Sequence, residues 1–186
     1  RCTRTRAKLT SRCEWRYLFA LCIARWWRAP FVDTSASASW MGMSLTTTPD
    51  DVLRSVYEGV ALSLADCGDP LGMTGDLVVS SGGFRSDLIC EVLADVTGRS
   101  VVRQSAPETG ARGAAVLALT VAGRYDTVED AAAAMTCSFE CFDPHPERGR
   151  IYRAVAEVYF ESRVAIRPVW PSMREIRNMK EADSVN

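Results

Sequence analysis

A pair of glycines, Gly82 and Gly83, follows an apolar run and precedes a stretch with helical periodicity. Glycine lets a ligand approach the backbone closely, and the unpaired N–H groups at the start of a helix favour an anion or another polar atom. Phe84, Arg85 and Asp87 complete the entry to this helix. The pattern indicates a binding turn, although spacing alone favours an ordinary tight turn.

Two of these side chains have a structural explanation beside the chemical one. Arg85 is equally suited to neutralising a phosphate and to facing solvent on the turn. Asp87 would stand in the first turn of the helix, where the helix dipole favours an acid. Neither residue type identifies the ligand.

The remaining chemistry-bearing residues form weaker patterns. Cys137, Cys141 and His145 are spaced four apart, but zinc takes four protein ligands in structural sites, or three and a water in catalytic ones. Spacing places no fourth ligand, so we favour a loop here over a metal site. His145 is the one imidazole of the chain, and no order of Ser, His and Asp suggests a hydrolase. We therefore assign no catalytic residue and no metal ligand.

The elements that would position the glycine pair form a β-turn-α-β-α unit over residues 77–118. The pattern predicts a buried strand at 77–80, the glycine turn, a helix with Leu88, Val92 and Leu93 on one face, a strand near 101–102 and a second helix from Glu108. The glycine pair thus leaves a strand and enters a helix.

Further helices are predicted on both sides of this unit. Pro49 and Asp50 signal the start of a helix that runs to about Asp66, with a buried stripe of Val52, Val56, Val60 and Leu64. A short strand is expected near 40–45. After the unit, Thr127 is the candidate N-cap of another helix, with Asp130 at its third position.

The last part of the chain is predicted as a loop, one long helix and a tail. Residues 137–146 are expected to be the loop. The helix should cover 147–166 and end before Pro168 and Pro171, while 172–186 should fray. Its buried side is expected to carry Ile151, Val155, Val158 and Tyr159.

The order of these motifs resembles the C-terminal half of the FGGY carbohydrate kinases. In that family a strand ends in Gly-Gly, a small residue, a basic residue and Ser, and the next helix ends in Ala-Asp. The matching segments here are Gly82 to Ser86, Ala94-Asp95, Glu108 to Ala115, Arg28 to Asp33 and Trp40 to Leu45. The family has Arg-Gly where this chain has Ser37-Ala38, which weakens any role for that loop.

The resemblance implies an α/β fold: a partial actin/hexokinase-type (ribonuclease H-like) ATPase domain with helices packed on a small sheet. It also implies transfer of the ATP γ-phosphoryl group, with Mg²⁺, to a sugar or polyol hydroxyl. A pentulose is the default substrate and a polyol such as erythritol is a close competitor. The residues that the resemblance assigns to the ATP site are Gly82, Gly83, Phe84, Arg85 and Asp87.

The family uses a much longer chain with two domains, so the resemblance implies that this chain is a fragment. The catalytic aspartate and the sugar-binding residues would belong to a missing N-terminal kinase half, and the fragment alone should be inactive. A homodimer is a possible assembly of the chain. The alternative is a non-catalytic remnant, or an α/β module that docks onto another protein through its sheet edge.

The net charge of −1 conceals two differently composed parts. Residues 1–28 carry eight Lys/Arg and one acid, Glu14, whereas the remainder carries fourteen basic and twenty-two acidic residues. We therefore divide the chain into a non-matching basic tail at 1–27, an incomplete FGGY-type nucleotide-binding domain at 28–170 and a polar tail at 171–186.

Composition disfavours several other classes of protein. A nucleic-acid-binding arm at the basic tail is disfavoured because no binding motif accompanies its Arg and Trp residues. The apolar run at 17–24 is too short for a membrane span, and Arg and Trp stand where a signal peptide needs small residues. Seven irregularly spaced cysteines indicate reduced thiols. We expect a cytoplasmic protein without nucleic-acid or membrane partners.

Overall fold

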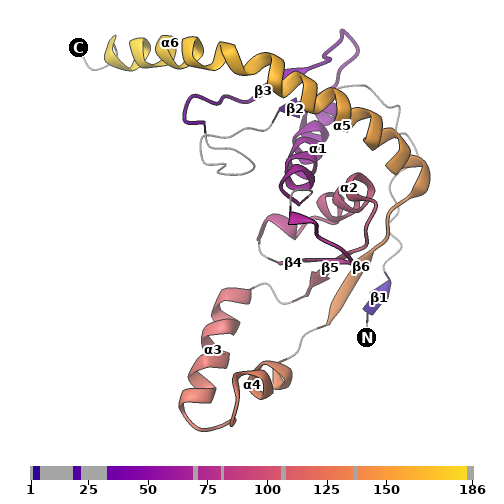
Figure 1. Ribbon diagram of the computed structural model, residues 1–186, viewed down its shortest axis with the longest axis vertical. Helices are drawn as coiled ribbons and strands as arrows, with labels where there is room; N and C mark the ends of the chain where they lie inside the picture. Colours follow the sequence, from indigo (N-terminus) through magenta and orange to yellow (C-terminus); the bar gives the residue numbers. More distant parts are fainter. Residues whose placement is uncertain are drawn as a thin grey trace.

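The computed structural model describes residues 2–4, 19–21, 33–68, 71–80, 82–105, 108–135 and 138–183. The chain folds into helices and a small mixed sheet (Figure 1). In chain order the elements are β1 (Cys2–Arg4), β2 (Phe19–Leu21), β3 (Ser39–Met41), α1 (Pro49–Gly68), β4 (Leu77–Val79), η2 (Gly82–Phe84), α2 (Asp87–Thr97), β5 (Val101–Gln104), α3 (Thr109–Val121), α4 (Val128–Ala134), β6 (Phe139–Phe142), α5 (Pro146–Ile166), η3 (Arg167–Val169) and α6 (Trp170–Asp183).

The main sheet has the strand order β1-β6-β5-β4. Strands β4 and β5 are parallel, with Leu77 opposite Val101, and β6 runs antiparallel to β5, with Phe142 opposite Val101. Strands β2 and β3 form a separate antiparallel pair. The predicted β-turn-α-β-α unit is thus confirmed, and the glycine turn lies at the carboxyl end of β4, next to the carboxyl end of β5.

The sequence specifies the end of helix α2 through a glycine. Ser86 is its N-cap residue with extended backbone, and Gly98 ends it in the left-handed conformation, at φ 66°, while its N–H donates to the carbonyl of Ala94. Only glycine adopts this conformation without strain, which makes it the usual residue after a helix. The predicted face of Leu88, Val92 and Leu93 does pack toward the sheet, where Val79, Val101 and Phe142 complete the core.

Helix α1 begins as predicted, but its most buried positions are not those of the predicted stripe. The Thr48 hydroxyl accepts from the N–H of Asp51 at 3.3 Å, and the Asp51 carboxylate accepts from the N–H of Thr48 at 2.8 Å, which is a reciprocal cap. The predicted stripe of Val52, Val56, Val60 and Leu64 is only half-buried. The fully buried positions are Ser55, Gly59, Ala61, Leu62, Ser63 and Gly68. Ala61 belongs to the core that α2 and the sheet share, and the half-buried Val60 and Leu64 pack against that core, whereas Leu62 packs on Tyr159 of α5.

Helices α3 and α4 pack on each other and stand away from the sheet (Figure 1). The prediction for Thr127 is confirmed: its hydroxyl accepts from the N–H of Asp130 at 3.1 Å and caps α4. Val116 and Ala131 are the buried residues of the two helices. Most of this helical pair is therefore surface.

Residues 137–146 are not simply a loop, because β6 occupies 139–142. The backbone of β6 pairs with β5, which lies more than thirty positions earlier in the chain. That pairing, rather than any local preference, makes the segment a strand. Residue 137 lies outside the described residues.

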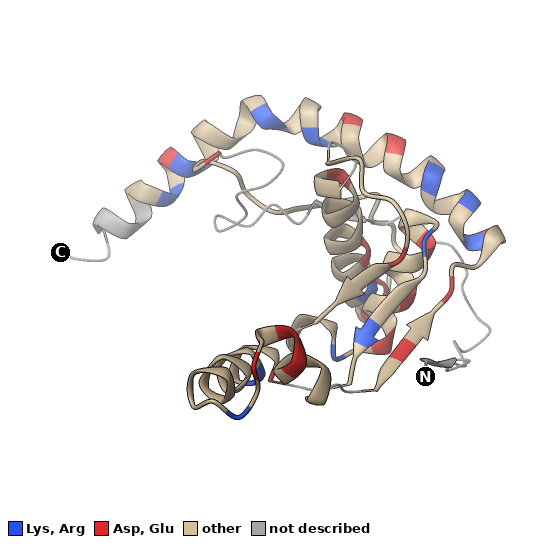
Figure 2. Ribbon diagram, turned by 60° about the horizontal axis from the view of Figure 1, so that its bottom comes forward, with Lys and Arg blue, Asp and Glu red and all other residues tan. Residues whose placement is uncertain are grey.

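Helix α5 is confirmed, but the chain continues as helix beyond its end. Pro168 lies within η3 and Pro171 in the first turn of α6, where a missing N–H costs nothing. Basic and acidic residues are mixed along α5 and α6 (Figure 2). The predicted stripe of α5 is wrong at Val158, which is 51% exposed, whereas Gly149, Tyr152 and Tyr159 are buried.

The cysteines are not uniformly reduced. Cys67 and Cys90 are free thiols, whereas Cys141 is disulfide-bonded, so the expectation of reduced thiols is wrong at this position. The basic tail predicted at 1–27 contains β1 and β2 and otherwise lies outside the described residues. None of the helices described is at once long enough and apolar enough to cross a bilayer.

Candidate functional site

The five residues predicted to bind a ligand lie together between β4 and α2. Gly82, Gly83 and Phe84 form the single turn η2, Arg85 follows it, and Asp87 is the first residue of α2. We call residues 82–87 the glycine turn. It follows the carboxyl end of a parallel strand, which is where open α/β sheets bind ligands.

The space in front of the two glycines is open. Both residues are exposed, and a Cβ atom built on either would meet no heavy atom of the described part of the chain within 4 Å. Neither has a positive φ. Within the described structure, neither internal packing nor backbone conformation therefore demands glycine here, whereas close approach of a ligand would.

The first turn of α2 has backbone N–H groups that can bind a polar ligand atom. Among the described residues, the Ser86 side chain makes no capping hydrogen bond to the helix. The N–H groups that a cap would satisfy are therefore available to a polar ligand atom. The acid of this turn, Asp87, is held by the guanidinium of Arg103 at 2.7 Å.

Arg85 connects the glycine turn to the start of α3. Its guanidinium lies 3.6 Å from the carboxylate of Glu108, which precedes α3. Both side chains are more than two-thirds exposed, and such pairs contribute about 1 kcal/mol or less. Arg85 can therefore turn toward an incoming anion at little cost.

Phe84 attaches the glycine turn to the core. Its side chain is half-buried against the main apolar cluster, and its carbonyl accepts from the Cys90 thiol at 3.7 Å. Burial raises the pKa of Cys90 to about 11, so this thiol is neutral near pH 7. Phe84 therefore has an anchoring role in this structure.

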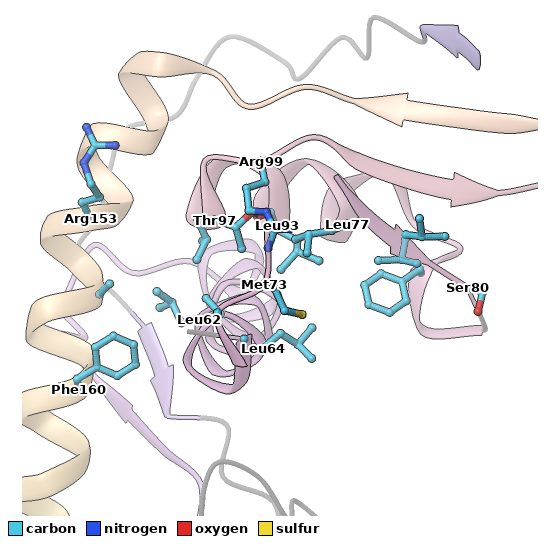
Figure 3. Close-up of a pocket in the computed structure, with 18 of the residues that line it drawn as sticks. Leu62, Leu64, Met73, Leu77, Ser80, Leu93, Thr97, Arg99, Arg153 and Phe160 are labelled. Atoms are coloured by element: carbon cyan, nitrogen blue, oxygen red, sulfur yellow. Dashed lines mark hydrogen bonds between the residues drawn. The ribbon is translucent and has the colours of Figure 1, made fainter. Parts of the chain in front are cut away.

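A cleft of about 710 Å³ is lined by residues of α1, β4, α2 and α5. In Figure 3, Phe160 and Arg153 of α5 border one side, Leu62 and Leu64 of α1 lie in the middle, and Ser80 is at the far end. The cleft meets the predicted site at Phe84, but the two glycines do not line it. The open space in front of the glycines is therefore not part of this cleft.

No group of three or more His, Cys, Asp or Glu side chains converges on a metal position within the described ranges. His145, one of the three residues considered for a zinc site, lies just before α5, and its backbone N–H donates to Asp95 at 2.7 Å. We therefore assign no Mg²⁺ ligand to the residues described.

Three residues near the glycine turn were not predicted as part of the site: Arg103, Glu108 and Glu140. Arg103 and Glu140 lie opposite each other on β5 and β6. A charged residue at an inward position of a strand is a signal that it has a partner, but the sequence does not say which one. Glu108 was identified only as part of a segment that resembles the FGGY family.

Comparison with known proteins identifies relatives over most of the chain. The pattern described as the FGGY family of carbohydrate kinases, C-terminal domain, matches residues 16–122, beginning within the stretch predicted to match nothing. Erythritol kinase of Brucella abortus is 30% identical over 149 residues, which are 78% of this chain and 29% of that enzyme.

Solved structures share the fold. The ligand-bound xylulose kinase of Lactobacillus acidophilus superposes with a TM-score of 0.74 at 21% identity, over 85% of this chain and 33% of that one. The glycerol kinase of Plasmodium falciparum, solved with ADP, gives 0.63 at 18% identity, over 79% and 31%. The predicted actin/hexokinase-type α/β fold is thereby confirmed. The chain spans about a third or less of the length of these relatives.

Proposed function

Because the chain belongs to the FGGY family of carbohydrate kinases, we propose that its glycine turn forms the adenosine side of an ATP site. The complete enzyme would transfer the γ-phosphoryl group of ATP to a sugar or polyol hydroxyl. Such catalysis consists mainly of positioning and charge stabilisation. The chain would contribute the positioning of the nucleotide.

One observation carries this proposal: the open space in front of Gly82 and Gly83. Nucleoside atoms could approach the backbone there without meeting a side chain. The uncapped start of α2 offers N–H donors beside it, and Arg85 is exposed enough to face a phosphate. Phe84 would anchor the turn to the apolar core, and Asp87, its last residue, would be held by Arg103.

Mg²⁺ would neutralise phosphate charge in the complete enzyme. Since the described residues offer no converging acidic side chains, we assign it no ligand here and derive no step from it. The nucleotide is therefore the ligand to test with this chain.

We propose a pentulose as the acceptor, with a polyol such as erythritol as the competing choice. The groups that bind the sugar and take up its proton would lie in the part of the relatives that this chain does not span. We accordingly expect no sugar-dependent ADP production from the purified 186-residue chain with a panel of pentuloses and polyols. Sugar-dependent turnover would contradict the proposal that the sugar-binding and proton-accepting groups lie outside this chain.

The decisive experiment measures ATP binding by calorimetry with Gly83→Arg. The new side chain should fill the open space and weaken ATP affinity about tenfold or more. Ala132→Arg is the matched control, because it adds the same side chain at an exposed position of α4 and should leave affinity unchanged. Equal affinities for the two variants would contradict the proposal.

Protein docking is the second candidate function. Among the described strands β4 pairs only with β5, and Val78 in its middle is 66% exposed. Because backbone groups alternate along a strand and the N–H of Leu77 bonds to Ser100 on the β5 side, the N–H of Val78 faces the open edge. Failure of the unaltered chain to bind ATP would favour this candidate, a strand of another polypeptide being the partner.

A further inference from the structure

Arg103 reaches from the sheet to the glycine turn. It lies on β5, and its side chain is 14% exposed. Its Nη1 donates to the carbonyl oxygens of Phe84 and Arg85, each at 3.0 Å. One terminal nitrogen therefore holds two successive peptide groups of the turn.

The other nitrogens of the same guanidinium bind two carboxylates. Nη2 donates to Asp87 at 2.7 Å and to Glu140, and Nε donates to Glu140 at 2.9 Å. The guanidinium also lies over the ring of Phe142, 5.0 Å from its centroid. Arg103 thus links the turn, the first residue of α2 and the neighbouring strand β6.

This set of contacts needs a guanidinium. Its five N–H donors lie in a rigid plane, whereas a lysine ammonium has three donors on a compact head and cannot reproduce the fork. Because the C=O and N–H of a trans peptide point in opposite directions, binding the Arg85 carbonyl turns the N–H of Ser86 away from Arg103. Arg103 therefore sets which way the backbone donors of the turn point.

We propose that Arg103 is the positioning residue of the nucleotide site: it holds the glycine turn in the conformation that binds ATP without touching ATP itself. The proposal rests on the proposed function for its ligand, but the contacts that carry it are independent of any ligand. It assigns to β5 a role in binding that the resemblance did not give it.

The test compares Arg103→Met and Arg103→Lys in the 186-residue chain with the matched control Arg163→Met. Arg163 is similarly buried, pairs with Asp66 and lies 5.4 Å from the Phe160 ring centroid, but it is on α5, away from the turn. Each variant is measured for ATP affinity, for amide hydrogen exchange of residues 82–89 without nucleotide, and for thermal stability.

Arg103→Met should weaken ATP binding about tenfold or more and speed exchange at 82–89, and Arg103→Lys should give smaller changes in the same direction. Arg163→Met should lower stability but change neither affinity nor exchange at the turn. If Arg103→Lys, which retains the charge and most of the packing, leaves both affinity and exchange as in the parent, the proposal is overturned.

The two proposals fail in different ways. A parent chain that does not bind ATP overturns the proposed function, and the exchange measurement then still decides whether Arg103 holds the turn. A parent that binds ATP, with Arg103 variants that bind equally well, overturns the role of Arg103 alone. An equal loss of affinity in Arg163→Met would show a general effect of lost stability and also overturn it.

Discussion

The carboxylate of Asp95, near the end of α2, is paired with the guanidinium of Arg148 in the first turn of α5, fifty-three residues later. The same carboxylate accepts the backbone N–H of His145 at 2.7 Å. Asp95 is 3% exposed. Gly149 allows this approach, because a Cβ there would lie 3.2 Å from the carbonyl oxygen of Asp95. One buried acid thus fixes the start of α5 against α2.

Asp95→Ala should destabilise the chain by about 3 kcal/mol, because it leaves the Arg148 charge and the His145 N–H without their shared acceptor. Asp95→Asn should cost less, since its amide oxygen can still accept the N–H. Urea unfolding measures both. Glu108→Ala, which removes the exposed pair with Arg85, is the control and should cost about 1 kcal/mol or less. Equal costs at the two sites would show that burial of Asp95 is unimportant.

Glu91 of α2 should make stability depend on pH. It is 8% exposed, and its Oε2 has no hydrogen-bond partner among the described residues. Burial raises the pKa of Glu91, as do the charges of Asp95 and Asp87, while Arg148 and Arg54 oppose the shift. The folded chain therefore holds this proton more tightly than the unfolded chain, whose carboxyl has a pKa near 4.5.

It follows that the stabilising contribution of protonated Glu91 is complete below about pH 4.5 and is lost as pH rises through the raised pKa. Glu91→Gln stays neutral, so its stability relative to the parent should increase with pH and then level off. Thermal unfolding of both proteins from pH 4 to 8 tests this. A difference between them that does not change with pH would contradict the assignment.

Local signals in the sequence predicted most of the helices and the strands around the glycine turn. Caps and helix-start residues act within a few positions, as at Thr127 and Pro49, and can be read directly. The strand β6 and the helix α6 could not be predicted this way. Strand β6 depends on pairing with β5. Helix α6 depends on the burial of Trp170, which lies between Pro168 and Pro171, against Ala36 and Ile166.

The same distinction between local and long-range contacts applies to the candidate site. Residues 82–87 are contiguous, so the sequence placed them together. Arg103 and Glu140 approach the turn only because β5 and β6 pair, and their residue types gave no indication of the partner. The small buried residues of α1, Ser55 and Gly59, were missed for a related reason: a hydrophobic stripe does not represent buried positions occupied by small side chains.

Cys90 should resist thiol reagents in the folded chain. It is fully buried and its pKa is raised to about 11, chiefly by burial, so the reactive thiolate is scarce at pH 8. Cys67 is half-buried and free and should react first with iodoacetamide. Peptide mass spectrometry reports each site separately, and urea should make the two equally reactive. Rapid native labelling of Cys90 would contradict its burial.

Trp170 should anchor the whole of α6. It is completely buried, whereas the hydrogen bonds from Arg174 to Thr34 and from Arg177 to Ser37, which also join this helix to the described chain, are exposed. Trp170→Ala should cost about 3–5 kcal/mol of packing. Because α6 contacts the rest of the described chain mainly at its start, we expect this loss to appear as local opening.

Hydrogen exchange should therefore accelerate across 170–183 in Trp170→Ala and remain slow across α2, whose core does not include Trp170. Arg174→Ala is the control, because losing one exposed hydrogen bond should barely change exchange in α6. Equal acceleration in α2 and α6 would mean that the tryptophan belongs to the global core. Unchanged exchange in α6 would mean that the exposed bonds suffice to hold it.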